Sequence, residues 1–437
     1  MRWAERYHRR RAEALYLHVP FCANKCAYCD FASWAMPEGD PLMDAYARAL
    51  RAQLAELGGL GMLDGIGTAY IGGGTPTLLG ARALASLVAG IRELCPHVVE
   101  LSVEANPDSL SDEVLAALVR SGATRVSIGV QSLHDQELHA LGRIHTARQA
   151  CERVGAAVEA GLDVSCDLMC AIPHQTDASW RDSLGGALEL GVDHVSVYPL
   201  AIEEGTALAR RVGAGEPAWN DPDVQASRME QAARRLAAAG LVRYEVASYA
   251  RPGRTCAHNR MYWTGRPYLG LGTSAASMLT REGYGLLRTR CPQLPEAPAG
   301  AVRARLTVTT GRRELAAHPA LDALSFDLEF LGERQALAED LMLGARRSSG
   351  MAPALACAAE DAFGTTWQDV RRVALDRHLV RAASDGALVP TEAGWLLGNE
   401  LYGLMWGLAD GDVRQTPSCR CRGSWPRRAS QRGHTTL

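Results

Sequence analysis

The stretch PFCANKCAYCDFAS, residues 20–33, places three cysteines in C-x3-C-x2-C spacing directly after an apolar run that predicts a β-strand. The cysteines are Cys22, Cys26 and Cys29, and no fourth cysteine stands beside them. A compact cysteine trio favours a metal site, and metal sites of this kind normally close at four ligands. The spacing therefore predicts a metal-binding loop with one ligand position left for something other than a cysteine.

Three interpretations of this loop stay open from the residues alone. Zinc would require a fourth protein ligand, which Asp30 or His18 could supply. The cysteines could also be purely structural. An iron–sulfur cluster is favoured, because such a loop can wrap three irons of a cubane and leave the fourth iron open to a small molecule that carries an amine and a carboxylate.

The whole chain has the composition of an ordinary globular protein. It has 437 residues, of which 47% are hydrophobic and 22% charged, and its formal net charge of -3 gives no bulk reason to expect nucleic-acid or membrane binding. The Arg-rich start lacks the apolar core of a signal peptide, and no run approaches the ~20 apolar residues of a membrane span. We therefore expect a cytoplasmic protein, in which the 12 cysteines serve metal or redox chemistry rather than disulfides. Lys25, the only lysine, lies between two of the trio's cysteines, which excludes Schiff-base chemistry.

Strand-like and helix-like runs alternate over the first 250 residues. This alternation predicts βαβ units on a parallel sheet, and six or seven units suit a barrel, complete or partial. Functional side chains of such barrels lie at the C-terminal ends of the strands, where the cysteine trio and the segments GGGTP, EANP, GVQS and YPLA all fall. The expected strands lie at 14–19, 67–73, 98–105, 124–130, 162–172, 194–200 and 242–249.

The pattern divides the chain into five parts. We expect an N-terminal extension at 1–13, a partial barrel at 14–290, a linker at 291–325 around CPQLPEAPAG, a C-terminal helical domain at 326–412 and a disordered basic tail at 413–437. Helices followed by a strand pair make the C-terminal domain resemble a winged helix, and the lack of a basic stripe favours a lid over a DNA-binding role. The tail has six arginines and no acid, and its Cys419 and Cys421 are a weak metal signal.

The segment YLHVPFCANKCAYCDF resembles the signature of radical S-adenosylmethionine (radical SAM) proteins, and its Y-x-H-x-P-F-C start resembles the coproporphyrinogen dehydrogenase-like branch. The resemblance covers about residues 14–410. It implies an α/β fold, a (β/α)6-like partial TIM barrel with a C-terminal winged-helix-like domain. It also implies a [4Fe-4S] cluster whose open iron binds S-adenosylmethionine (SAM), which an electron from the cluster cleaves to a 5′-deoxyadenosyl radical.

The resemblance also assigns the residues around SAM. The glycine loop would bond the amino group of SAM, Glu104 an ammonium or a ribose hydroxyl, and the backbone of Ala201 the adenine, while Tyr16 would pack near the cluster. The full set of residues implied for SAM is Tyr16, Gly73, Gly74, Thr75, Glu104, Gln131, Arg143, Asp167 and Ala201.

Two features separate branches within this family. Dehydrogenases carry a further cysteine two residues after the third, where this chain has Phe31. The replacement, together with HNRMYW at 258–263, resembles the HemW-type haem chaperones. In that branch His258 would be an axial haem ligand, and Tyr262 and Trp263 would cover the macrocycle.

The chain departs from the family pattern in two places. DLMCAIPHQT, residues 167–176, replaces the usual Y-G-L-P-G-Q-T and puts Cys170 and His174 near the site. We interpret both as tolerated packing changes, with a further haem contact as the alternative for His174. Ala276 stands where the family has a second histidine near the haem. Cys256 is then an alternative thiolate ligand.

These observations favour a haem chaperone that hands haem to respiratory apoproteins, including membrane-associated ones, over two enzymes. The alternatives are an oxygen-independent coproporphyrinogen III dehydrogenase and a radical enzyme acting on RNA, for which the extra basic domain is missing. We expect no nucleic-acid partner, and the sequence leaves monomer and dimer open.

Overall fold

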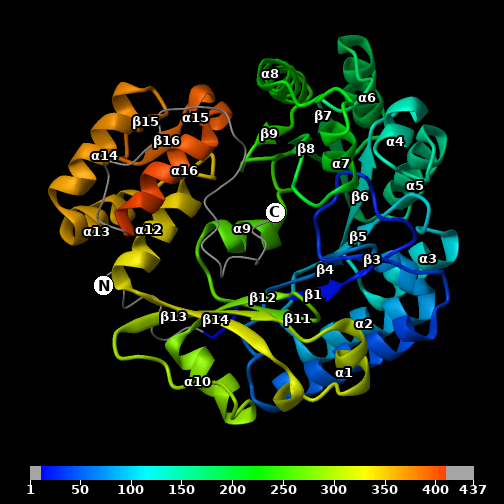
Figure 1. Ribbon diagram of the computed structural model, residues 1–437, viewed down its shortest axis with the longest axis horizontal. Coiled ribbons are helices and arrows are strands. Elements are labelled where there is room, and N and C mark those ends of the chain that lie inside the picture. Colours follow the sequence, from blue (N-terminus) through cyan, green and yellow to red (C-terminus); the bar gives the residue numbers. More distant parts are fainter. Residues whose placement is uncertain (1–10, 410–437) are drawn as a thin grey trace.

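The computed structural model describes residues 11–409. The N-terminal part of the expected extension and the basic tail with Cys419 and Cys421 lie outside the described residues. A curved sheet of 12 strands organises this part of the chain, in the order β14-β13-β12-β11-β1-β4-β5-β6-β7-β8-β10-β9 (Figure 1). Within residues 11–409, none of the helices combines the length and the apolar character that crossing a bilayer demands.

Six parallel strands, each followed by a helix or helices, form the centre of the sheet. They are β1 (Ala14–Val19), β4 (Thr68–Gly73), β5 (Glu100–Ala105), β6 (Arg125–Gln131), β7 (Asp163–Cys170) and β8 (His194–Pro199). The helices between them are α1 (Pro41–Gly59), η2 (Pro76–Leu79), α2 (Gly80–Leu94), α3 (Asp112–Ser121), α4 (Asp135–Ala140), α5 (Ala147–Glu159) and α6 (Asp177–Glu189), and α7 (Ala207–Gly213) and α8 (Pro222–Ala238) follow β8. This arrangement confirms the predicted α/β partial barrel.

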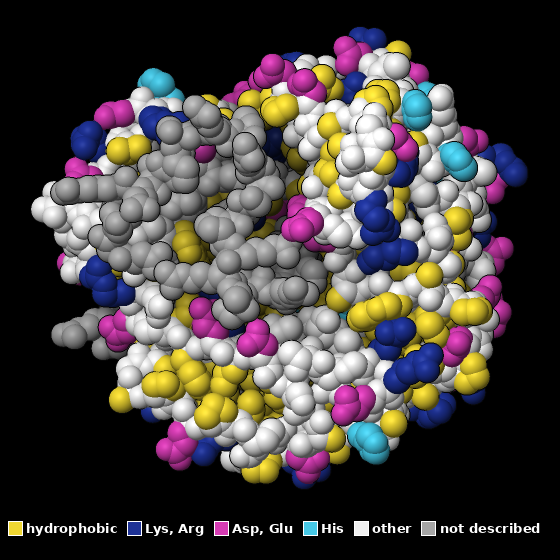
Figure 2. All heavy atoms as spheres, in the orientation of Figure 1, with side chains coloured by type: hydrophobic (Ala, Val, Ile, Leu, Met, Phe, Trp, Pro, Cys, Tyr) yellow, Lys and Arg dark blue, Asp and Glu magenta, His cyan; other side chains and the backbone are white. Residues whose placement is uncertain are grey.

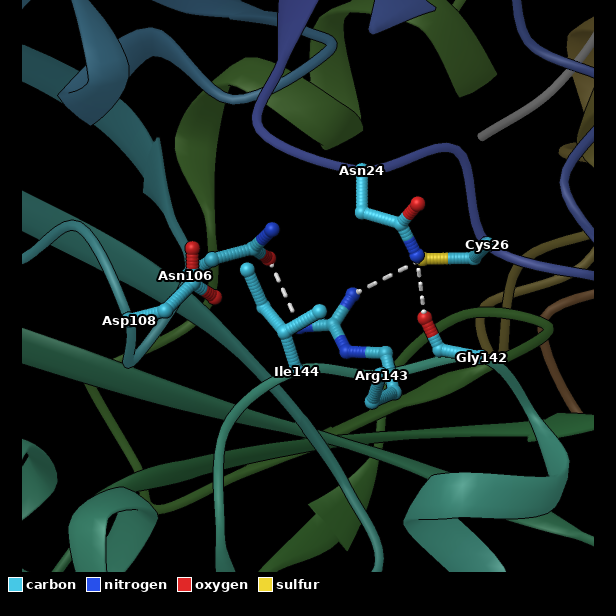
Figure 3. A pocket seen from close by; sticks show the side chains of 7 residues that line it. All are labelled: Asn24, Cys26, Asn106, Asp108, Gly142, Arg143 and Ile144. Atoms are coloured by element: carbon cyan, nitrogen blue, oxygen red, sulfur yellow. Dashed lines mark hydrogen bonds between the residues drawn. The ribbon is translucent and has the colours of Figure 1, made fainter. Parts of the chain in front are cut away.

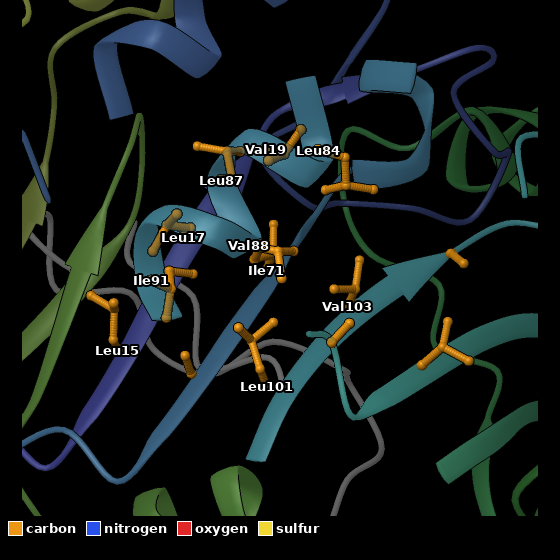
Figure 4. Close-up of a cluster of buried hydrophobic side chains, with 14 of the residues drawn as sticks. Leu15, Leu17, Val19, Ile71, Leu84, Leu87, Val88, Ile91, Leu101 and Val103 are labelled. Atoms are coloured by element: carbon orange, nitrogen blue, oxygen red, sulfur yellow. The ribbon is translucent and has the colours of Figure 1, made fainter. Parts of the chain in front are cut away.

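Alternation along each strand gives the sheet two unlike faces. Leu15, Leu17 and Val19 of β1 are fully buried on the outer face, where they and their neighbours on β4 and β5 pack against helix α2 (Figure 4). The intervening residues, Tyr16 and His18, belong to the inner face. The same period puts Tyr70, Glu104 and Asp167 on the inner face, so the inside of the barrel is polar.

Antiparallel strands extend both edges of the parallel block. β11 (Tyr268–Leu271) pairs with β1 in parallel, and β12 (Ala276–Thr280), β13 (Ala301–Val308) and β14 (Phe326–Gly332) follow it as antiparallel strands. At the other edge, the strand expected at 242–249 is in fact two short antiparallel strands, β9 (Val242–Arg243) and β10 (Ser248–Ala250). A turn between them holds Glu245, which is buried.

The prediction of a linker over 291–325 is wrong. This segment contains β13, α11 (Arg312–Ala317) and η3 (Leu321–Ala323), and it follows α10 (Arg281–Arg290). The strand was concealed because Arg303, in the middle of β13, is a charged residue that is buried. Its guanidinium pairs with Glu339 at 3.0 Å and with Asp340 at 2.6 Å.

The C-terminal domain has a hydrophobic core of its own. It contains α12 (Glu333–Gly344), α13 (Pro353–Phe363), α14 (Thr365–Asp376), β15 (Val380–Ala382), β16 (Leu388–Pro390), α15 (Glu392–Leu396), α16 (Gly398–Trp406) and η4 (Gly407–Ala409). Helices and a strand pair are present as expected. Its helix α12 packs on α9 (Ala257–Trp263) and on β13, at one side of the barrel (Figure 1).

Candidate cofactor site

The cysteine loop leaves the C-terminal end of β1 and returns beside it. Cys22 ends β2 (Phe21–Cys22), which pairs with β3 (Trp34–Ala35), while Cys26 and Cys29 lie half-buried in the loop between these strands. Lys25 ties the loop together, because its Nζ donates to Phe31 O at 2.5 Å and to Ser33 Oγ at 2.9 Å. The lone lysine therefore fixes the shape of the loop, a role that the sequence did not reveal.

The residues of this loop fit an iron–sulfur cluster in their chemistry. Among residues 11–409 no preassembled metal-ligand group is present, so the three thiols would have to draw together around a cluster. Burial raises the pKa of the Cys22 and Cys29 thiols, and the Lys25 ammonium acts in the opposite direction. Of the two residues considered as a fourth zinc ligand, His18 already bonds Tyr16 Oη through Nδ1 (3.0 Å) and Ala32 O through Nε2 (2.9 Å), whereas Asp30 is exposed.

The glycine loop after β4 lies against the cysteine loop. Gly73 has a φ of +112°, and a Cβ there would lie 2.4 Å from the His18 ring. A Cβ on Gly74 would lie 2.5 Å from Phe21 O, and Thr75 N donates to that carbonyl at 2.7 Å. Both positions therefore need glycine, because only a residue without a side chain lets the two loops approach this closely.

Glu104, at the end of β5, is bound to the glycine loop. Its Oε2 accepts from Gly73 N at 2.7 Å, and its Oε1 accepts from the hydroxyl of Tyr70 at 3.0 Å. Burial raises the pKa of Glu104 to about 7, although both hydrogen bonds act to lower it. A carboxylate that lacks a compensating charge in this way would gain most from a cationic ligand.

A small pocket joins Arg143 to the cysteine loop (Figure 3). Arg143 donates to Asn106 Oδ1 at 2.7 Å and to Gly129 O at 2.6 Å, and its Nη1 lies 3.5 Å from Cys26 Sγ. The residues that line this pocket are Asn24, Cys26, Asn106, Asp108, Gly142, Arg143 and Ile144. Asn106 was missed in the sequence analysis, although it stands only two residues after Glu104 in EANP.

The remaining expected SAM residues lie at the same end or on the inner face. Gln131 ends β6 at a bulge with a φ of +66°, and a Cβ on Gly129 would lie 3.0 Å from its Nε2 and 3.2 Å from Arg143 Nη2. Asp167 accepts from Ser127 Oγ at 2.8 Å, and burial raises its pKa. Ala201 is exposed just after β8.

Tyr16 and Tyr70 stack inside the barrel, with ring centroids 6.2 Å apart. Tyr16 is linked to the cysteine loop through His18, which bonds both the Tyr16 hydroxyl and Ala32 O. Tyr70 was missed, because an inward-facing tyrosine in a strand reads as ordinary core from sequence.

The segment HNRMYW lies at the opposite end of the barrel. It forms α9, and its first turn is capped by Glu100, whose carboxylate accepts from Ala257 N at 2.7 Å and from His258 N at 2.9 Å. Glu100 is the first residue of β5, whereas Glu104 is near its last. The structure therefore brings the cysteine and glycine loops together at one end of the strands and the predicted haem motif to the other. Tyr70 lies between them, since its hydroxyl bonds Glu104 and its ring stacks on His258 with centroids 5.2 Å apart.

His258 is fully buried, and both of its ring nitrogens are engaged. Nδ1 lies 3.0 Å from Thr68 Oγ1, and Nε2 lies 3.1 Å from Tyr262 Oη. Burial lowers the pKa of His258 to about 3. Trp263 is also buried, beneath the guanidinium of Arg346. In this arrangement neither nitrogen of His258 is open to an iron atom, so the residues present do not fit haem without a movement of α9.

The other candidate haem residues are either buried or exposed. Cys256 is buried, with Sγ 3.3 Å from Glu100 Oε1, and burial raises its pKa to about 12. Cys170 is buried at the end of β7. His174 is exposed, and its ring centroid lies 5.3 Å from that of Trp219, a residue that the sequence analysis did not single out.

Comparison with known proteins gives these residues a family context. The sequence model of the Radical SAM superfamily matches residues 16–185. "Heme chaperone HemW" of Mycobacterium tuberculosis is 42% identical over 266 residues, which cover 60% of this chain and 68% of the relative. "Heme chaperone HemW" of Bacillus subtilis is 30% identical over 406 residues, covering 90% of this chain and 99% of the relative. The solved structure of coproporphyrinogen III oxidase (HemN) from Escherichia coli, described as a radical SAM enzyme, matches 92% of each chain with a TM-score of 0.71 at 20% identity, which is a likeness of fold.

Proposed function

Because the chain belongs to the radical SAM superfamily, and within it to the family of the haem chaperone HemW, we propose that it binds haem and delivers it to apoproteins. The acceptors that we propose are respiratory haem proteins, membrane-associated ones included. We also propose that it holds a [4Fe-4S] cluster on Cys22, Cys26 and Cys29, with SAM on the iron that no cysteine binds.

One observation carries the cofactor part of the proposal. The cysteine loop, the Gly73 amide, the Glu104 carboxylate and the Arg143 guanidinium meet at one end of the barrel, with Arg143 Nη1 3.5 Å from Cys26 Sγ. A molecule with an ammonium and a carboxylate finds a partner for each charge here, because Glu104 is anionic above pH 7 and Arg143 is cationic.

The chain's own residues would bind and orient the cofactors. The cluster and SAM supply the radical chemistry when they are bound. Gly73, Gly74 and Thr75 would supply backbone groups to the ammonium of SAM, Gln131 and Asp167 would bind its nucleoside, and the backbone of Ala201 would contact the adenine. Tyr16 and Lys25 hold the loop through His18 and Ser33.

The family motif on α9 would make His258 a haem ligand, with Tyr262 and Trp263 as covering residues. Since both ring nitrogens of His258 are engaged, this assignment requires α9 to leave its place before iron can bind. That movement would break the two hydrogen bonds that backbone amides of α9 donate to Glu100. Haem binding at α9 would therefore be accompanied by an opening of the helix.

The second candidate function is an oxygen-independent coproporphyrinogen III dehydrogenase. Phe31, 39% exposed beside the cysteine loop, occupies the place where dehydrogenases have a further cysteine.

On the face drawn in Figure 2, basic side chains of the described residues are interspersed with acidic ones, so that face gives no support to an RNA substrate.

A single reconstitution experiment separates the two functions. Protein loaded anaerobically with iron and sulfide is mixed with haem and a haem-free acceptor, and separately with coproporphyrinogen III, SAM and a reductant. We expect a Soret band that moves to the acceptor and no protoporphyrinogen. Product formation with multiple turnovers, and no transfer of haem, would replace the chaperone by the dehydrogenase.

A further inference from the structure

The loop after β7 holds a histidine in a backbone conformation that suits glycine. Gln175 N donates to Ile172 O at 3.1 Å, which closes a turn with Pro173 second and His174 third, and the φ of His174 is +66°. Turns with proline second and a positive φ at the third residue ordinarily have glycine there. A side chain kept in such a conformation motivates a hypothesis of function.

The imidazole of His174 is accessible. It is exposed, its ring is tilted by 52° against Trp219, and no hydrogen bond from residues 11–409 engages either ring nitrogen. His258 offers the opposite case, with full burial and both nitrogens engaged. Of the two histidines, only His174 can reach an iron atom without a change in the fold.

An apolar cluster joins this loop to the cysteine loop. Ala27 and Tyr28, which lie between Cys26 and Cys29, share the cluster with Ile172 and Trp219. The helix α7 holds the two sides together, because Leu208 N donates to Ala27 O at 2.7 Å. His174 therefore stands on the rim of the barrel end that carries the cysteines, next to half-buried aromatic rings.

We propose that haem docks on this rim, with His174 as an axial ligand of the iron and the ring of Trp219 against the macrocycle. The inference rests on the proposed haem function and assigns it a site. A neutral imidazole is a common axial ligand, and flat aromatic side chains cover porphyrins well. Arg210, exposed on α7 two residues after Leu208, adds a cation for a propionate.

The position suits a carrier. A ligand on the surface can be exchanged for a ligand of the acceptor without unfolding any element, whereas release from α9 would require the helix to move twice. The site also puts haem at the same barrel end as the cluster, so the two cofactors would share the rim on which an acceptor docks.

The test is a haem titration of the cluster-loaded full-length protein, followed by the Soret band. His174→Asn removes the imidazole and keeps a residue that tolerates positive φ. The matched control is His378→Asn, because His378 is likewise exposed with a positive φ of 54° but lies in the C-terminal domain. We expect His174→Asn to raise the haem Kd by about tenfold or more, to shift the band, and to regain the band position on adding free imidazole. His378→Asn should match the wild type.

Trp219→Leu gives a second readout, since it should raise the haem Kd severalfold without moving the band. A wild-type Kd and band position in His174→Asn would overturn the proposal. Weaker haem binding in His258→Gln at the same time would place the haem at α9. Equal losses in His174→Asn and His378→Asn would overturn it too, because no particular imidazole would then be responsible. Failure of the wild type itself to bind haem would refute the proposed function.

Discussion

The two ends of the barrel differ in how their charged groups are compensated. At the C-terminal end, Glu104 has a pKa raised to about 7 despite two hydrogen bonds, and the three cysteines of the loop are free thiols. At the N-terminal end, Glu100 accepts from the first amides of α9, and His258 uses both ring nitrogens. The first end therefore keeps a carboxylate without a compensating charge, whereas the polar groups of α9 at the second end are paired.

The same strands carry residues at both ends of the barrel. The difference between the ends therefore comes from the groups that contact the inward-facing side chains. On β4, Thr68 contacts His258 Nδ1 near the start of the strand. Tyr70 donates to one oxygen of Glu104, and Gly73 N, at the end of the strand, donates to the other. The motif on α9 is packed into the fold in this structure, so the accessibility of its histidine has to be read from coordinates.

The largest effect that we expect follows Cys26→Ala. The cluster would lose one of its three thiolates, and anaerobically reconstituted protein should retain little iron and sulfide and no charge-transfer absorbance. Cys357→Ala is the control, because Cys357 is an exposed cysteine of the C-terminal domain. Iron and sulfide at the wild-type level in Cys26→Ala would contradict the cluster assignment.

At the N-terminal end, Glu100→Ala should lower the free energy of unfolding by about 3 kcal/mol, because two helix amides lose a charged acceptor. Denaturant unfolding of the cluster-free protein measures the loss. Glu113→Ala, an exposed acidic residue in the first turn of α3, should change it by less than about 0.5 kcal/mol. Equal stability of Glu100→Ala and wild type would show that α9 does not close the barrel.

At the C-terminal end, Glu104 should give stability a pH dependence. Its pKa is about 7 in the folded protein against an ordinary value of 4.5, so its contribution is fully present below pH 4.5 and is lost as the pH rises through 7. The loss is on the order of 3 kcal/mol. The free energy of unfolding should therefore fall less steeply between pH 5 and 8 in Glu104→Gln than in the wild type.

The same protonation should affect SAM. Binding of its ammonium requires the carboxylate, so calorimetric affinity should fall as the pH drops below about 7 in the wild type and stay nearly flat in Glu104→Gln. An identical pH profile in both proteins would remove Glu104 from the SAM site.

The parts that sequence predicted well are local in the chain. The strand-helix alternation depends on near neighbours, and the partial barrel followed from it. The burial of His258 could not be predicted, since its partner Thr68 is 190 residues away. β13 was missed because the carboxylates that allow Arg303 to be buried lie on α12. His174 stood out in the sequence, but its strained turn and its contact with Trp219 needed coordinates.

Hydrogen exchange on the cluster-loaded protein, with and without SAM and haem, tests the contrast between the two ends most directly. We predict that the ligands protect amides of residues 22–33, 72–75 and 171–176, and that amides of α9 exchange as slowly as before. Faster exchange throughout α9 on adding haem, with residues 171–176 unchanged, would contradict this account and show that α9 opens to hold the haem.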